Sequence, residues 1–283
     1  MRWVFCGCLL LLAWGAHFLG KKVGQQGRWA VFLGLVVCIP IIGTRWLIRV
    51  YPSTAGVLFP FDWYGTVHIW WGFPMALFLL GVPRTAKLGN TMRRLVRASS
   101  ILLWVAFMPY LVGVLLANPS ALNGMQDSRG LCNQTSNYSC GAASAASLLS
   151  HVGVRATESE MATLCHTNPM MGTDPVSVRY GLKKKLAGRN YDVTARRATW
   201  EDLTRRSEPA MALIKWGFLL DHWVVVLDAD QDIVTVADPT QGTIKCSRDQ
   251  FLDAWRGIIV TIDRKPPIPL GKALAMMWYW GGS

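Results

Sequence analysis

The first 118 residues of this 283-residue chain are largely apolar, and four apolar segments stand out within them. These segments run roughly over residues 3–20, 29–44, 64–82 and 99–117. Most are close to the ~20 residues that a helix needs to cross ~30 Å of hydrocarbon. The sequence therefore predicts an α-helical transmembrane domain of about four spans over residues 1–118.

The net charge of +12 is concentrated in this apolar part of the chain. Residues 1–118 contain eleven Lys and Arg against a single acid, Asp62, which is a charge of +10; the remainder contains eighteen basic and sixteen acidic residues, or +2. Basic residues in loops between apolar segments orient membrane spans. We therefore expect a lipid bilayer as a partner, and we do not expect nucleic acid.

The distribution of these charges predicts an orientation. The side opposite the most basic loops holds three positive residues, Arg2, Arg45 and Arg49. The loops after the first and third segments hold eight: Lys21, Lys22, Arg28, Arg84, Lys87, Arg93, Arg94 and Arg97. Because positive loops stay in the cytoplasm, the remainder of the chain is expected on the extracytoplasmic side.

Residues 119–264 have the composition of an ordinary globular domain, and residues 265–283 form an apolar tail. Within the globular part, a run of Ala, Ser and Leu follows Cys140, and Gly153 is a plausible end for a helix that begins at Cys140. A cysteine at the start of a helix has its thiolate favoured by the unpaired N–H groups there. Cys140 is therefore a candidate nucleophile; the alternative is a buried structural cysteine on an Ala-rich helix.

A second candidate group lies on a predicted β-hairpin. Two β-rich runs, residues 222–227 and 233–238, flank a polar turn. If the turn is centred on Asp230, His222 lies directly opposite Asp238, and the two Cβ atoms are about 5 Å apart on one face. An imidazole and a carboxylate would then meet; the alternative is a surface hairpin with incidental polar ends.

Gln134 precedes Cys140 by six residues, and its side-chain amide is placed to curl back toward the nucleophile. Its N–H group would join the backbone N–H of Cys140 in stabilising an oxyanion, although an ordinary loop glutamine is the simpler interpretation of Gln134 alone. Together the four residues indicate acyl transfer. Cys140 attacks a carbonyl, His222 moves the proton, Asp238 orients the imidazole and Gln134 stabilises the negative charge.

Other candidate groups are weaker. His151 and His166 are rival bases, and Cys165 next to His166 lacks a matching pair of metal ligands. We therefore expect neither a metal nor another cofactor. Cys132 is a candidate for a disulfide with Cys165 or Cys246 in an oxidising compartment.

These residues resemble a known family. The resemblance rests on Gln134, on CGAA at 140–143, on Gly172-Thr173, on HWVVV at 222–226 and on ADP at 237–239, and it covers about residues 128–262. The family is that of the bacteriocin-processing, double-glycine-leader cysteine peptidases. It implies an α+β papain-like domain in which a nucleophile-bearing helix packs on an antiparallel sheet that carries the His and the Asp. It also implies a peptide substrate cut after a Gly-Gly pair, and it assigns the same four roles to Gln134, Cys140, His222 and Asp238.

The chain departs from this family in its surroundings. Members are usually fused to an exporter with an ATPase domain, whereas no GxxxxGK[ST] loop occurs in this sequence. We therefore expect a membrane-anchored thiol protease of a bacterial inner membrane, without the transporter ATPase, that hydrolyses a peptide bond in a membrane-proximal substrate. Two alternatives remain: a transpeptidase or amidase on the same fold, and a degenerate domain that binds leader-like peptides.

Overall fold

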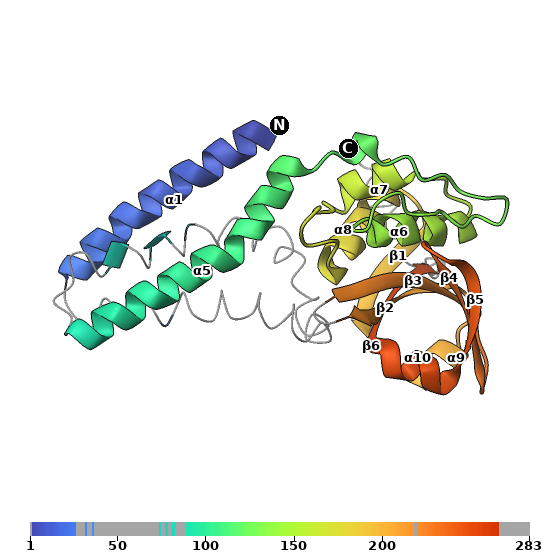
Figure 1. The fold of residues 1–283 in the computed structure, drawn as a ribbon. Coiled ribbons are helices and arrows are strands. Elements are labelled where there is room, and N and C mark those ends of the chain that lie inside the picture. The colour runs from blue at the N-terminus through green and yellow to red at the C-terminus, as the bar shows by residue number, and fades with distance from the viewer. Residues whose placement is uncertain are drawn as a thin grey trace, which may run out of the picture.

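The computed structural model describes residues 2–26, 89–217 and 220–265, together with the isolated positions 32, 36, 74, 77, 78, 81 and 82. Two long helices come first (Figure 1): α1 (Arg2–Gln25) and α5 (Asn90–Leu116), which contains Pro109. The predicted apolar segment 3–20 lies within α1, and the segment 99–117 lies within α5 except for its last residue. The predicted segments 29–44 and 64–82 lie almost entirely outside the described residues, as does the apolar tail from residue 266.

The prediction of membrane spans finds no support in this part of the chain. Among the described residues, none of the helices combines the length and the apolarity that crossing a bilayer requires. Both long helices also include charged positions, Lys21 and Lys22 near the end of α1 and Arg93, Arg94 and Arg97 in the first turns of α5. The presence of helices at 3–20 and 99–117 is confirmed, but their role as spans is not.

The rest of the described chain is built on one antiparallel sheet with the strand order β1-β6-β2-β3-β4-β5. Its middle strands, β2 and β3, belong to one hairpin and carry mainly buried residues. The six strands are β1 (Tyr191–Arg197), β2 (Ala210–Gly217), β3 (Leu220–Ala229), β4 (Ile233–Asp238), β5 (Gly242–Ser247) and β6 (Trp255–Arg264).

Helices cover both faces of this sheet (Figure 1). One face carries α6 (Cys140–His151), α7 (Glu158–Leu164) and α8 (Pro175–Lys185), preceded by the short 3-10 helix η2 (Pro119–Ala121). The other face carries α9 (Trp200–Thr204) and α10 (Arg248–Ala254).

Two hydrophobic cores result from this arrangement. Strand β3 alternates between them: Trp223 and Val225 pack in the core beneath α6, whereas Val224 and Val226 pack in the core that includes residues of α9 and α10. Such alternation is the period-two pattern of a strand buried on both faces. The continuous apolar run at residues 223–226 is thus explained by the burial of β3 on both faces.

Helix α6 begins at Cys140 and ends at His151, which confirms the predicted helix. Its four alanines, at positions 142, 143, 145 and 146, are completely buried. Small side chains let the helix axis approach the sheet closely, as the sequence indicates. The fold therefore places Cys140 at the N-terminus of a helix that packs directly on the central strands.

The β3–β4 hairpin has a different register from the predicted one. Val225 pairs with Ala237 and Ala229 pairs with Val234, and a β-bulge lies between Val226 and Asp228. The turn is therefore displaced from Asp230, and the predicted direct opposition of His222 and Asp238 is wrong by two residues. Because side chains alternate with period two, an offset of two keeps both residues on the same face as diagonal neighbours.

Candidate active site

Cys140 is positioned by the way α6 is fastened to β3. The hydroxyl of Ser144, one turn after Cys140, donates a 2.9 Å hydrogen bond to the carbonyl oxygen of Trp223. A Cβ atom at Gly141 would lie 2.7 Å from Thr173 Cβ and 3.1 Å from Trp223 Cδ1, so this close packing requires glycine. The start of the helix is therefore held against the residue that follows His222, and Cys140 itself is 7% exposed.

His222 and Asp238 form a buried pair. Nε2 of His222 lies 3.1 Å from Oδ1 of Asp238, and the same oxygen accepts hydrogen bonds from the backbone N–H and the hydroxyl of Thr240. The Asp238 carboxylate is thus held by Thr240 as well as by the imidazole. An N–H on Nε2 that donates to Asp238 leaves Nδ1 as the ring nitrogen that can accept a proton.

The electrostatic interactions of His222 involve the Cys140 side chain as well as Asp238. Burial by itself lowers the pKa of His222, but hydrogen bonds to Asp238 and to Cys140, together with the charges of both partners, outweigh it and raise the pKa from 6.5 to about 9. Burial raises the pKa of Asp238, and the hydrogen bonds from His222 and Thr240 reverse this effect, so its pKa is lowered overall. These interactions favour a protonated His222 imidazolium next to the Asp238 carboxylate at neutral pH.

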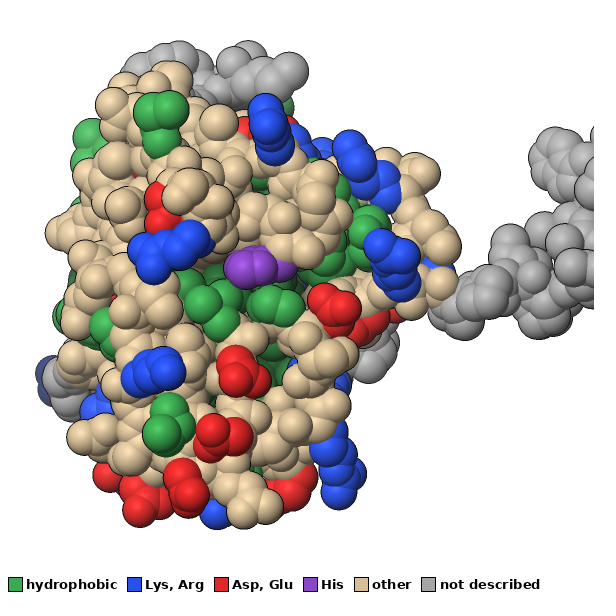
Figure 2. All heavy atoms as spheres, turned by 90° about the vertical axis from the view of Figure 1, so that its right-hand side faces the viewer, with side chains coloured by type: hydrophobic (Ala, Val, Ile, Leu, Met, Phe, Trp, Pro, Cys, Tyr) green, Lys and Arg blue, Asp and Glu red, His purple; other side chains and the backbone are tan. Residues whose placement is uncertain are grey.

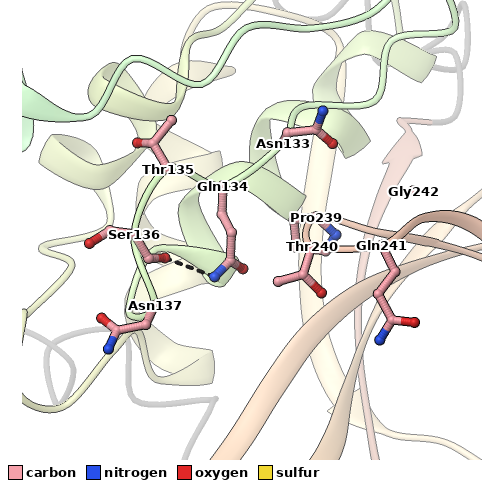
Figure 3. Close-up of a pocket in the computed structure, with 9 residues that line it drawn as sticks. All are labelled: Asn133, Gln134, Thr135, Ser136, Asn137, Pro239, Thr240, Gln241 and Gly242. Atoms are coloured by element: carbon pink, nitrogen blue, oxygen red, sulfur yellow. Dashed lines mark hydrogen bonds between the residues drawn. The ribbon is translucent and has the colours of Figure 1, made fainter.

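Gln134 lies in the loop that leads to Cys140 (Figure 3). Its backbone N–H donates to the carbonyl oxygen of Pro239, 2.9 Å away, and its side-chain Nε2 donates to the carbonyl oxygen of Ser136 at 2.8 Å. That Ser136 oxygen also accepts the hydroxyl of Ser139, the residue before Cys140. The amide is therefore tied to the start of α6, and one of its two N–H groups remains for another acceptor.

A polar cavity of about 590 Å³ adjoins Gln134. Figure 3 shows it between the loop before α6 and the turn that joins β4 to β5. No charged side chain lines it; the nine lining residues are Asn133, Gln134, Thr135, Ser136, Asn137, Pro239, Thr240, Gln241 and Gly242. The cavity can offer hydrogen bonds to a peptide backbone or to uncharged polar side chains.

An exposed aromatic ring borders the imidazole on another side. The ring of Trp216, at the end of β2, has its centroid 4.6 Å from that of His222 and is tilted by 44° to it. Trp216 and Leu220 are both more than half exposed. On the face of the molecule drawn in Figure 2, hydrophobic side chains gather among polar and charged ones. A substrate that reaches His222 would contact apolar as well as polar surface.

The structure thus brings Cys140, His222 and Asp238 together and places Gln134 nearby. It does not bring His151 or His166 to this site: both are exposed, and the ring of His166 stacks on that of Tyr180. Cys132, Cys165 and Cys246 are free thiols, so none of the considered disulfides is present among the described residues. Within the same residues, no cluster of three or more His, Cys, Asp or Glu is arranged to hold a metal ion.

Three residues of the site were missed by the sequence analysis. They are Ser144, which bonds to the strand that carries His222, Trp216, which contacts the His222 ring, and Thr240, which bonds to Asp238. Thr240 had a signal, because a Thr two residues after an Asp at a strand end favours an Asx turn. Ser144 and Trp216 had none, since their partners lie on other elements.

Comparison with known proteins places part of this chain in a family. Residues 129–267 match the Peptidase C39 family. An uncharacterized protein of Methanothermobacter marburgensis is 34% identical over 137 residues, which span 48% of this chain and 89% of that protein. The chain belongs to the Peptidase C39 family. The C39 domain is also 28% identical over 130 residues to the lactococcin-G-processing and transport ATP-binding protein of Lactococcus lactis, covering 45% of this chain and 18% of that protein.

Solved structures that are similar to part of this chain include two peptidases. The peptidase domain of Streptococcus ComA, a bifunctional ABC transporter involved in quorum sensing, is 22% identical, with 51% of this chain and 98% of that chain covered and a TM-score of 0.41. A double glycine motif protease from an AMS/PCAT transporter, in complex with its leader peptide, is 16% identical, with 51% and 92% covered and a TM-score of 0.41.

Proposed function

We propose that the C39 domain of this chain hydrolyses a peptide bond with Cys140 as the nucleophile. One observation carries the proposal: His222 interacts with the Cys140 side chain and, through Nε2, with the buried Asp238. A nucleophile, a base and a group that orients the base are the components of covalent acyl transfer. Family membership supports the same reaction class.

In this mechanism, the Cys140 thiolate attacks the carbonyl carbon and a C–S bond forms. The resulting oxyanion accepts hydrogen bonds from the backbone N–H of Cys140 and from the free N–H of Gln134 Nε2. His222, as the imidazolium, protonates the leaving nitrogen, the C–N bond breaks, and a thioester and an amine remain. His222, now neutral, removes a proton from water, which attacks the thioester; the C–S bond breaks, the carboxylic acid leaves, and the thiolate–imidazolium pair is restored.

The proposed substrate is a peptide with a Gly-Gly or other small pair before the cleaved bond. Support comes from the resemblance to double-glycine-leader peptidases and from the relative in Lactococcus lactis, whose name describes processing of lactococcin G. The uncharged cavity beside Gln134 supports a substrate that is held mainly by backbone and neutral polar hydrogen bonds.

Product analysis tests this function and separates it from group transfer. The full chain is incubated with a peptide that contains one internal Gly-Gly pair and with a control in which both glycines are Val. Mass spectrometry is expected to find cleavage after Gly-Gly, with a free carboxylate on the acyl fragment, and at least about tenfold less cleavage of the control, because bulkier side chains must be rejected by a pocket for small residues. An acyl fragment captured mainly by an added amine would indicate a transpeptidase instead.

We also propose that the chain lies at a membrane, with the C39 domain outside the cytoplasm. Several large apolar side chains on the two long helices are strongly exposed to the surroundings, Leu11, Trp14, Val105 and Leu116 among them. An apolar surface of this kind is unfavourable in water and favourable against lipid. After expression in bacteria, the full chain is expected to stay in the membrane pellet through alkaline carbonate extraction and to be digested by protease added outside the cytoplasm. Release by carbonate would contradict the membrane location, and resistance to the protease would contradict the orientation.

A further inference from the structure

Glu158 is a completely buried carboxylate in the C39 domain, outside the group described above. It begins α7, and no Lys or Arg pairs with it among the described residues. A buried charge without a counter-ion is costly unless hydrogen bonds replace the lost water. Hydrogen-bond donors must therefore surround the Glu158 carboxylate.

The hydrogen bonds of Glu158 converge on two loop segments. One oxygen accepts the backbone N–H of Thr135 at 2.9 Å, and the other accepts the hydroxyl of Thr135 at 2.7 Å and the backbone N–H of Gly124 at 2.8 Å. The packing is tight, since a Cβ atom at Gly124 would lie 2.7 Å from Glu158 Oε2 and 2.0 Å from the carbonyl oxygen of Asn133. Glu158 thus ties Thr135, the residue after Gln134, to Gly124, whose backbone lies against the carbonyl oxygen of Asn133, the residue before Gln134.

Two further hydrogen bonds hold Gln134 itself. The Gln134 backbone N–H donates to Pro239, next to Asp238, and its side chain donates to Ser136, next to the start of α6. Its Oε1 is buried and has no hydrogen-bond partner among the described residues. The amide therefore has little to hold it besides Ser136 and the backbone of its own segment, and the position of that backbone depends on Glu158.

We propose that Glu158 is a positioning residue for the oxyanion donor: it holds the segment 133–135 so that the amide of Gln134 reaches the developing negative charge. The inference rests on the proposed function. Charge-assisted hydrogen bonds from backbone and hydroxyl donors are short and directional, and a displacement of an oxyanion donor by a fraction of an ångström weakens transition-state stabilisation. Glu158 acts on kcat through Gln134 and does not touch the substrate.

A double-mutant cycle on the full chain tests this coupling. Gln134→Ala alone is expected to lower kcat by about a hundredfold or more, the usual effect of removing an oxyanion donor. Glu158→Gln alone is expected to lower kcat by about tenfold with little change in KM, because one charge-assisted clamp is lost. In the Gln134→Ala background, Glu158→Gln should change kcat by less than about twofold, since coupled residues are not additive.

Alkylation of Cys140 by iodoacetamide separates positioning from damage to the fold. That reaction forms no oxyanion, so Glu158→Gln should leave its rate unchanged while kcat falls. Glu160→Gln is the matched control, an exposed glutamate on the same helix that pairs with Lys185 at the surface, and it should leave both rates unchanged. Thr135→Val, which removes one donor to Glu158 at an exposed position, provides a milder second variant and is expected to lower kcat only in the presence of Gln134.

The outcomes are distinct. Equal fold-losses from Glu158→Gln or Thr135→Val with and without Gln134, or a parallel loss of the alkylation rate, would overturn the inference and leave the proposed function standing. A wild-type chain that alkylates at Cys140 but turns over no peptide would overturn the proposed function, and this inference with it.

Discussion

Replacing Cys140 with alanine is expected to lower the rate of peptide hydrolysis by at least about a thousandfold, since removal of a nucleophile leaves only the assistance of the oxyanion donors and of binding. The change is small in volume, and Cys140 lies at the first residue of α6, where alanine is a good helix former. The fold should therefore persist while the chemistry disappears. Turnover of the Gly-Gly peptide, followed by mass spectrometry, measures the loss.

Cys246→Ala is the matched control for this experiment. Cys246 is a free, partly exposed thiol on β5 whose Sγ lies near the carbonyl oxygen of Val234. The same substitution there removes a thiol without touching the pair of His222 and Asp238, so hydrolysis should stay within about twofold of wild type, as is usual for substitutions away from a site. Hydrolysis retained in Cys140→Ala would refute the proposed mechanism.

Cys140→Ala should also change the pKa of His222. A raised pKa means that the bound proton stabilises the fold below the ordinary value of 6.5 and that this contribution is lost as the pH rises through about 9. Cys140→Ala removes a hydrogen bond and a charge that raise the pKa of His222, so the pKa should fall. NMR titration of the imidazole measures it, and in the wild type the rate should decline on the alkaline side near pH 9.

Replacing Trp223 with alanine is expected to cost about 3–5 kcal/mol of the free energy of unfolding, the usual range for a large aromatic side chain in a core. Trp223 is 1% exposed, its Nε1 donates to the carbonyl oxygen of Thr173 at 2.9 Å, and its ring lies against Gly141. The substitution therefore leaves both a cavity and an unpaired carbonyl oxygen beneath the start of α6. Unfolding of the C39 domain in urea, followed by circular dichroism, measures the loss.

Trp216→Ala provides the comparison, because Trp216 lies on the neighbouring strand but is 52% exposed. Its loss should cost less than about 1 kcal/mol, as surface substitutions usually do, although the ring next to His222 would be missing from the active site. Equal destabilisation by the two substitutions would show that Trp223 does not fasten α6 to the sheet.

Local sequence patterns predicted much of this domain. The run of small residues after Cys140 indicated a helix that packs closely on a sheet, and α6 is that helix. The two β-rich runs on either side of the polar turn at Asp230 indicated a hairpin with His222 and Asp238 on the same face. Its register was wrong by two residues because the turn and the bulge after Val226 depend on packing, for which this stretch has no clear sequence signal.

The sequence by itself determined the elements and the chemical groups. They are a helix that starts at Cys140, a hairpin that carries His222 and Asp238, and the Gln134 amide in the loop that leads to Cys140. The tertiary structure alone decided how these groups are held. Ser144 bonds to a strand 79 residues away, and Glu158 clamps a loop that precedes it by 23 residues. Helix and strand propensities act over a few residues, whereas such contacts exist only after distant segments pack, so no local pattern could reveal them.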